Sequence, residues 1–473
     1  MNRVVVTGMG AICGLGHDLD TIWKGMVSAK SGISLLEKAD LSKLPIRVGG
    51  EVKNFTIAPS LLSETDASHF DDFCLFALHA AEEAYLDAKL NEGNFDPSRV
   101  GSVLGVGIGG FPFIEQNYAT LLEKGARRVS PFFISGMIPN MPAGLICMHY
   151  GFNGPNMAVT SACASAGHAL ETSYRYIQTG VSDIIFSGGC EGILRGFLGI
   201  SGFAVIKALS KTEDPTKASR PFDKGRNGFV MGEGSAILVL ESLDSAKKRN
   251  AKIYAEIIGC GATADAYHIT APHPEGKEAS RAMQLAMSYA GIKPTDIDYI
   301  NAHGTSTPVG DVAETMAIKK VFNDHAYKLN ISSTKSVTGH LLGAAGGIES
   351  IACVKALETD TIPPTANLED PDEKCDCKKT DQGGMRAMAA EKYKKTYVSV
   401  IAVHMPGKAP KPIRFQLPDG RSYHIDHVGS PAQAPALKAG GQGLRYEVRI
   451  MDRRTYLFYD NGSWFIEEKV EAA

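Results

Sequence analysis

Residues 161–169 read Ser-Ala-Cys-Ala-Ser-Ala-Gly-His-Ala, and residues 338–347 read Thr-Gly-His-Leu-Leu-Gly-Ala-Ala-Gly-Gly. Small side chains allow close backbone approach, so each stretch predicts the start of a helix packed tightly against its neighbours. We treat the two stretches as counterparts in an internal repeat, with Cys163 matched to His340, 340 − 163 = 177 positions later.

The sequence before each stretch supports the repeat. A helical pattern over 76–87 leads through Pro97 into an apolar strand at 100–106. A second helical pattern over 279–290 leads through Pro294 into a strand at 297–301. Alternating helices and buried strands predict a layered α/β fold of two similar halves, 1–250 and 251–380. If the halves face each other, both helix starts meet at one central site.

The composition is typical of a soluble globular protein. Hydrophobic residues make up 44% and charged residues 21% of the 473 residues, and the net charge is −3. That charge gives no global indication of a nucleic-acid or membrane partner. The N-terminus predicts a buried strand from Val4 that ends in a turn at Gly8, not a signal peptide. We expect a cytoplasmic protein.

Cysteine spacing predicts no metal site. The pair in Cys375-Asp376-Cys377 lacks the two-residue gap and the second pair of a zinc site, so a polar loop is the simpler interpretation.

The composition changes beyond residue 380. Short strands are predicted at 397–403, 412–417, 422–427, 445–450, 455–459 and 464–467, with turns at Pro418-Asp419-Gly420 and Asp460-Asn461-Gly462. A segment rich in Pro, Ala and Gly at 431–443 predicts a linker. We expect a separate small all-β module over 390–470.

Cys163 is the first candidate catalytic residue. A lone cysteine in an apolar stretch is usually a core thiol. A position at a helix start favours a nucleophile instead, because the helix dipole lowers the thiol pKa and backbone N–H groups can stabilise an oxyanion. His303 follows a strand and His340 precedes a helix, although each could equally satisfy a turn. Lys335 is either an exposed loop cation or a buried, paired one.

Three segments resemble the active-site signatures of type II β-ketoacyl-[acyl carrier protein] synthases, closest to the long-chain elongating form. They are 159–165 (Val-Thr-Ser-Ala-Cys-Ala-Ser), 301–308 and 333–349. Residues 128–133, 221–223 and 228–234 also match, and the resemblance covers 1–378. It implies a thiolase-like fold and condensation of an enzyme-bound acyl group with malonyl-ACP, releasing CO2.

The resemblance also implies roles for single residues. Cys163 would carry the acyl group, and His303 and His340 would stabilise the enolate of malonyl-ACP. Lys335 and Glu349 match positions that orient His340, and Thr305 and Thr307 match positions that bind the phosphopantetheine arm. Ile108 and Phe203 would line the acyl pocket. Lys207 and Lys211 would dock the carrier. The last two are also typical of a solvated surface. The expected partners are acyl carrier protein and a second copy of the chain, with no cofactor.

The C-terminal end departs from the family pattern. The family's glycine-rich loop, which supplies an oxyanion-hole N–H, has no counterpart, and the nearest stand-in is 399–407. Two alternatives follow: a non-catalytic partner of an active synthase, or an enzyme that only decarboxylates malonyl-ACP. The change in sequence also suggests that two genes were joined near residue 380, with Met385 or Met388 as a former start.

Overall fold

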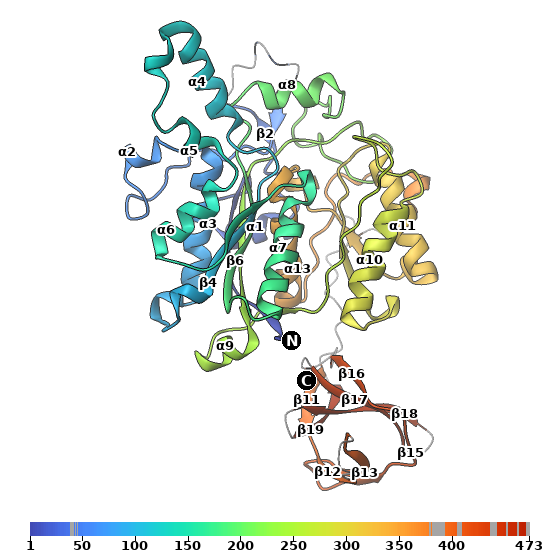
Figure 1. Cartoon of the computed structure of the whole chain (residues 1–473). Coiled ribbons are helices and arrows are strands. Elements are labelled where there is room, and N and C mark those ends of the chain that lie inside the picture. The colour runs from blue at the N-terminus through green and yellow to red at the C-terminus, as the bar shows by residue number, and fades with distance from the viewer. Residues whose placement is uncertain are drawn as a thin grey trace. The chain divides into compact units, whose positions relative to one another are not determined.

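The computed structural model describes residues 1–37, 42, 44, 46–377, 380, 393–403, 409–435, 442–450, 453–460 and 463–469 (Figure 1). The chain divides into two compact units. The first comprises Met1–Ala286 and Pro294–Met388, and the second comprises Met287–Lys293 and Ala389–Ala473. Each unit is described by itself below.

A six-stranded mixed sheet forms the centre of the first unit. Its order is β5-β4-β6-β7-β1-β8. Strand β4 pairs parallel with both β5 and β6, whereas β7 is antiparallel to β6 and β1, and β8 is antiparallel to β1. The strands are β1 (Val4–Cys13), β4 (Val100–Gly105), β5 (Asn156–Val159), β6 (Ile184–Glu191), β7 (Gly234–Ser242) and β8 (Ala255–Ile257).

Strand β1 is longer than the sequence predicts. Every residue from Val4 to Cys13 is buried, and Gly8 lies in a bulge within the strand, so the predicted turn at Gly8 is wrong. A Cβ atom at Gly8 would come within 2.4 Å of the carbonyl oxygen of Ala84. The glycine is therefore needed because helix α3 packs directly on the strand.

Helices cover both faces of this sheet. On one face, α3 (Asp72–Asp87) contacts β1, β6 and β7 and packs against α6 (Met141–Tyr150). On the other face, α7 (Ser165–Gln178) and α13 (Ala345–Thr359) contact each other and the sheet, and Figure 1 shows them side by side. Separate clusters of buried apolar side chains fill the two interfaces. The expected layered α/β arrangement is confirmed.

The second half of the repeat contributes a smaller described sheet. Strand β9 (Tyr299–Asn301) pairs parallel with β10 (Asn330–Ser332), and α13 also contacts β9. Helices α10 (Lys277–Ala290) and α11 (Gly310–Phe322) precede and follow β9 in the chain. Helix α13 thus contacts strands of both sheets.

The internal repeat is offset by 180 positions, not by 177. A short 3₁₀ helix precedes each central helix: η5 (Ala162–Ala164) precedes α7, and η8 (Leu342–Ala344) precedes α13. Their first residues have left-handed backbones, with φ of 51° at Ala162 and 48° at Leu342. The structural counterpart of Cys163 is therefore Gly343, and His340 lies in the loop before η8.

The other elements of the first unit are short or peripheral. They are β2 (Ser34–Leu35), β3 (Val48–Gly49), α1 (Leu19–Val27), α2 (Glu64–Ala67), α4 (Phe111–Lys124), α5 (Phe133–Met137), α8 (Leu198–Val205), α9 (Leu243–Lys248) and α12 (Lys335–Thr338). No helix within the described ranges is long and apolar enough to cross a membrane.

Cys375 and Cys377 are buried, which corrects the expected polar loop.

Apart from Met287–Lys293, the described part of the second unit is all-β, as expected. Its two sheets have the orders β11-β19-β18-β17-β15, with β16 also on β17, and β12-β13-β14. They enclose an apolar core that includes Phe415, Tyr446, Leu457 and Trp464. The strands are β11 (Tyr393–Tyr397), β12 (Ser399–Val403), β13 (Lys411–Gln416), β14 (Ser422–His424), β15 (His427–Val428), β16 (Ala432–Pro435), β17 (Gln442–Ile450), β18 (Arg453–Asp460) and β19 (Ser463–Lys469).

Two expectations for this unit change. The predicted linker contains strand β16, which pairs with β17. The segment 399–407 begins with β12, which pairs with β13 in this unit, while 404–407 lie outside the described residues. Met385, Met388 and the predicted turn at Asn461-Gly462 also lie outside them.

Candidate functional site

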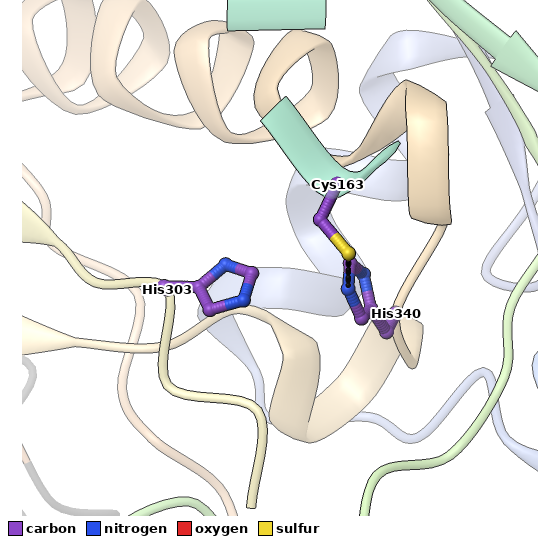
Figure 2. Close-up of side chains that lie close together, drawn as sticks. All are labelled: Cys163, His303 and His340. Carbon is purple, nitrogen blue, oxygen red and sulfur yellow. Dashed lines mark hydrogen bonds between the residues drawn. The ribbon is translucent and has the colours of Figure 1, made fainter. Parts of the chain in front are cut away.

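Three residues from separate loops meet beside the start of α7. Cys163 lies in η5, His303 follows β9, and His340 follows α12. The Sγ atom of Cys163 is 2.9 Å from Nε2 of His340, and the two histidine rings meet edge to face with centroids 5.3 Å apart (Figure 2). The three residues predicted from the sequence therefore lie together.

The backbone around His340 selects one tautomer of its ring. The N–H of Leu342 donates a hydrogen bond to Nδ1 of His340, at 3.2 Å. An Nδ1 that accepts a hydrogen bond leaves the ring proton of a neutral imidazole on Nε2. We therefore assign Nε2–H as the donor to the sulfur of Cys163, a hydrogen bond that favours the thiolate form.

Both histidines are neutral at physiological pH. Burial lowers the pKa of His340 well below its usual value, and the charges of Lys335 and His303 lower it further. Desolvation also lowers the pKa of His303, to about 3, with Lys335 as the second cause. The side chain of His303 is exposed, whereas that of His340 is buried. A neutral imidazole donates an N–H without carrying positive charge into the site.

The acidity of the Cys163 thiol differs from the sequence-based expectation. Burial raises the pKa of its thiol above the ordinary value, although the charge of Lys335 acts in the opposite direction. The effect expected of a helix start is thus smaller than the cost of removing a thiolate from water. The hydrogen bond from His340 and the nearby lysine offset only part of this cost.

Lys335 and Glu349 form a buried ion pair next to the three residues. The lysine side chain is 3% exposed, and its Nζ contacts Oε1 of the glutamate. Burial raises the pKa of Glu349, and the adjacent Lys335 opposes that rise. Lys335 also lowers the pKa of both histidines. The pair therefore acts on the site through its charge, and the alternative of an exposed loop cation is wrong.

The spacing of the three residues raises the question of a metal ion. One ligand atom from each of Cys163, His303 and His340 lies within 4.8 Å of the others. A metal-bound histidine usually donates its second ring N–H to an acceptor. In His340 that nitrogen instead accepts from Leu342, and the nitrogen facing the sulfur carries the proton. This donor set fits hydrogen bonding to an anion better than it fits a metal.

The loop after His303 presents two threonines. Thr305 is buried, and its hydroxyl lies 3.1 Å from that of Thr307. Arg226, which the sequence did not single out, supports this loop by donating to the carbonyl oxygens of Thr307 and Pro308, both at 3.1 Å. The loop geometry thus depends on a buried arginine more than 75 residues away in the chain.

An apolar cluster lies beside His340. Phe229 packs edge to face on the His340 ring, with centroids 5.4 Å apart, and Phe203 packs in the same way on Phe229. Ile108 and Leu342 belong to the same cluster. The space lined by Leu209, Phe229 and Met231 in this cluster leaves no room for a water molecule. Both predicted pocket residues, Ile108 and Phe203, are partly buried and pack against the cluster.

Lys207 and Lys211 line one open hollow of about 330 Å³, together with Arg47. Both lysines are exposed, and the hollow lies on the surface next to the apolar cluster through the shared residue Leu209.

Glu314 on α11 is a second residue that the sequence alone did not identify. Its carboxylate accepts the backbone N–H groups of His303, at 2.7 Å, and Gly304, at 2.8 Å. These contacts hold the loop that carries His303. A glutamate eleven positions after a histidine has no sequence signal of its own, because the contact depends on how the loop folds back on the helix.

Two repeated α/β halves with a Cys-His-His site at their junction define an acyl-transfer enzyme of the thiolase-like class. Residues 1–246 match the family model "Beta-ketoacyl synthase, N-terminal domain", and residues 254–369 match "Beta-ketoacyl synthase, C-terminal domain". The chain belongs to the β-ketoacyl synthase family.

Individual relatives agree with this assignment. A protein named 3-oxoacyl-[acyl-carrier-protein] synthase 2 from Synechocystis is 48% identical over 375 residues, which are 79% of this chain and 90% of that protein. Its namesake from Coxiella burnetii is 47% identical over 376 residues, with the same coverage of both chains.

Solved structures are also similar. The chain matches a β-ketoacyl synthase from Burkholderia phymatum with a TM-score of 0.76 and 32% identity, over 84% of this chain and 96% of the other. It matches a type II polyketide ketosynthase solved in complex with its acyl-carrier protein with a TM-score of 0.73 and 32% identity, over 80% and 92%.

Proposed function

We propose that the chain is a condensing enzyme that joins an acyl group held on Cys163 to the two-carbon unit of malonyl-ACP, in fatty-acid elongation. The observation that carries this proposal is the placement of two neutral histidines beside one thiol, with His340 Nε2 2.9 Å from Sγ. Such a site can bind the acyl group covalently and stabilise an anion without a metal.

The first step is acyl transfer. The thiolate of Cys163 attacks the thioester carbonyl of acyl-ACP, the carbonyl–sulfur bond to the carrier breaks, and the carrier thiolate leaves and takes a proton. The products are an acyl thioester on Cys163 and free carrier thiol. Backbone N–H groups at the start of η5 are suited to stabilise the tetrahedral intermediate, because they lie next to the sulfur.

The second step is decarboxylation and condensation. Malonyl-ACP loses CO2, and the electron pair of the broken carbon–carbon bond forms an enolate of the carrier thioester. N–H donors on His303 and His340 stabilise the enolate oxygen. The enolate carbon then attacks the acyl thioester, and the thiolate of Cys163 leaves and takes a proton. The net reaction consumes one proton and releases CO2, free carrier and β-ketoacyl-ACP.

The remaining predicted residues have places in this scheme. Thr305 and Thr307 would bind the phosphopantetheine arm through their hydroxyl groups. Ile108 and Phe203 would line the acyl pocket, and Lys335 with Glu349 would orient His340. The acidic carrier would dock at the hollow bordered by Lys207 and Lys211, which have the complementary charge.

The identity of the partner is supported by the related ketosynthase that was solved with its acyl-carrier protein. We also propose a homodimer and a cytoplasmic location, as the family resemblance implies. The reaction needs no cofactor, because both carbon units arrive as activated thioesters on the carrier's own arm.

Mass spectrometry after incubation with acyl-ACP tests the proposal. We expect an acyl adduct on Cys163 and CO2 release from malonyl-ACP. CO2 release without an adduct would instead identify an enzyme that only decarboxylates, the outcome expected if the absent glycine loop is essential for acyl transfer. Neither signal would indicate a non-catalytic relative, although the names of the relatives favour the condensing enzyme.

A further inference from the structure

Glu191, the last residue of β6, has an unusual set of partners. Its side chain is fully buried, and its carboxylate accepts four backbone N–H groups. Oε1 accepts from Ile108 and Gly109, each at 3.1 Å. Oε2 accepts from Gly107 at 3.0 Å and from Gly343 at 2.9 Å. No salt bridge to a cation is found for it in the described part of the chain.

These four contacts join the two halves of the repeat. Gly107 to Gly109 form the loop after β4 in the first half, whereas Gly343 belongs to η8 in the second half. A Cβ atom on Gly343 would lie 2.1 Å from the backbone nitrogen of Gly107. The two backbones therefore touch. The Glu191 carboxylate bridges them by accepting hydrogen bonds from N–H groups of both segments.

The ionised form of Glu191 suits this position. Burial raises its pKa to about 7, and the four N–H donors act in the opposite direction. All four approach as donors, so a protonated carboxyl would place its O–H against an N–H group. Backbone dipoles therefore take the role that a cation has in other buried pairs.

The residues on either side of the bridge face the same apolar cluster. Ile108 in the first loop and Leu342, next to Gly343, both pack into it, and Leu342 also donates its N–H to His340. The space lined by Leu209, Phe229 and Met231 in this cluster has no room for a water molecule, so an alkyl chain that enters the cluster must displace side chains or backbone. Three of the four hydrogen bonds hold loop 107–109, which carries Ile108, in place.

We propose that Glu191 is a positioning residue that fixes the backbone of loop 107–109 against η8, so that an acyl chain that enters the cluster must move side chains and not this backbone. This inference deepens the proposed function and rests on it, because the proposed function supplies the acyl chain. Glu191 makes no hydrogen bond with Cys163 or with either histidine in the described structure. Its charge contributes to the raised pKa of the Cys163 thiol, an effect that two alkylation rates measured on the same thiol share. Its positioning role acts through the loop and η8.

Alkylation of Cys163 tests this role without requiring any catalytic turnover. In this reaction the sulfur displaces iodide and forms a thioether, and mass spectrometry measures its rate. Iodoacetamide needs little space, whereas N-octyl iodoacetamide must place its alkyl chain in the closed cluster. The measured quantity is the ratio of the octyl rate to the iodoacetamide rate in the full-length chain.

In E191Q, the amide nitrogen must face two of the four N–H donors, which removes two hydrogen bonds and releases the loop. We expect the ratio to rise by about fivefold, because opening the cluster then costs less free energy.

G107A disrupts the same hydrogen bonds without a change of charge, since a Cβ at Gly107 would lie 2.7 Å from Oε2 of Glu191 and displace it. The same rise is expected.

E241Q is the matched control. Glu241 is also fully buried, but it lies at the other end of the β6–β7 ladder, opposite Ile184, where it pairs with Arg249. Its substitution should lower thermal stability and leave the ratio unchanged. An unchanged ratio in both E191Q and G107A, or an equal rise in E241Q, would overturn the proposal. A rise in a chain that takes no acyl group from acyl-ACP would refute the proposed function and leave the role of Glu191 intact.

Discussion

Nε2 of His340 lies 2.9 Å from Sγ of Cys163, and the N–H of Leu342 on the other side of the ring places the imidazole proton on that nitrogen. His340 is therefore a hydrogen-bond donor toward the sulfur. A histidine with the opposite tautomer would accept the thiol proton as a general base. The backbone of η8, and not an acidic side chain, makes this choice.

Replacing His340 by alanine removes this donor. We expect CO2 release from malonyl-ACP to fall by about 10²–10³-fold, because one anion-stabilising donor is lost. Acylation of Cys163 should fall less, since the thiolate loses a partner but remains the nucleophile. Parallel assays of CO2 release and of the acyl adduct measure the two effects. An equal loss in both would contradict the separate role of the histidine in decarboxylation.

The acidity of Cys163 gives a pH prediction. Burial raises the pKa of the Cys163 thiol above its ordinary value, so the thiolate fraction keeps increasing with pH through the neutral range. The rate of alkylation by iodoacetamide should rise about tenfold per pH unit from pH 6 to pH 9. Both histidines are already neutral there, so no second step should appear. A plateau below pH 8 would show that the thiol pKa is lowered instead.

Lys335 is predicted to act on stability and on the histidines. In K335M, Glu349 is left buried without its partner, at a cost of about 3–5 kcal/mol. The double variant K335M/E349L should recover most of the thermal stability, because it removes both charges. Loss of the lysine charge should raise the pKa of His303 and His340 in either variant, which moves the acid limb of CO2 release to higher pH.

The assay that distinguishes these effects is a thermal melt together with a pH profile. An acid limb that stays in place in the double variant would show that Lys335 has no electrostatic influence on the histidines.

Glu314 should affect decarboxylation through the position of His303. In E314Q, one of the two backbone N–H groups of His303 and Gly304 loses its acceptor. We expect CO2 release to fall by about tenfold with little change in the acylation of Cys163. E278Q on α10 is a suitable control, since the ion pairs of Glu278 among the described residues are with exposed cations on its own helix. Equal acylation and decarboxylation defects would indicate general misfolding.

The sequence predicts the halves and the three central residues because they depend on local signals. Apolar runs identified β4 and β9, and small-residue stretches identified the starts of α7 and α13. The matching of Cys163 with His340 was wrong by three positions. The left-handed backbones that align the repeat occur at Ala162 and Leu342, and neither residue type indicates such a conformation.

Residues that act through long-range contacts were not predictable in this way. Glu191 and Arg226 meet these partners 81 to 152 positions away, so their roles depend on the packing of one half on the other. The acidity of Cys163 was misjudged for the same reason. The helix start is visible in the sequence, whereas the degree of burial that outweighs it is a property of the folded site.

The C-terminal unit is predicted to fold without the rest of the chain. Its apolar core is formed by its own strands, with Leu457 and Tyr446 almost fully buried and the Trp464 ring packed at a tilt against Tyr446 and Tyr459. A fragment of residues 389–473 should therefore show a cooperative thermal transition, followed by the fluorescence of Trp464. W464A removes the core aromatic and should abolish the transition, whereas I401T on the exposed face of β12 should preserve it. A fragment that stays unfolded would show that the strands require the condensing-enzyme unit. A folded fragment would agree with an origin by gene fusion, which sequencing of the transcript and an intact-mass measurement of the protein test directly.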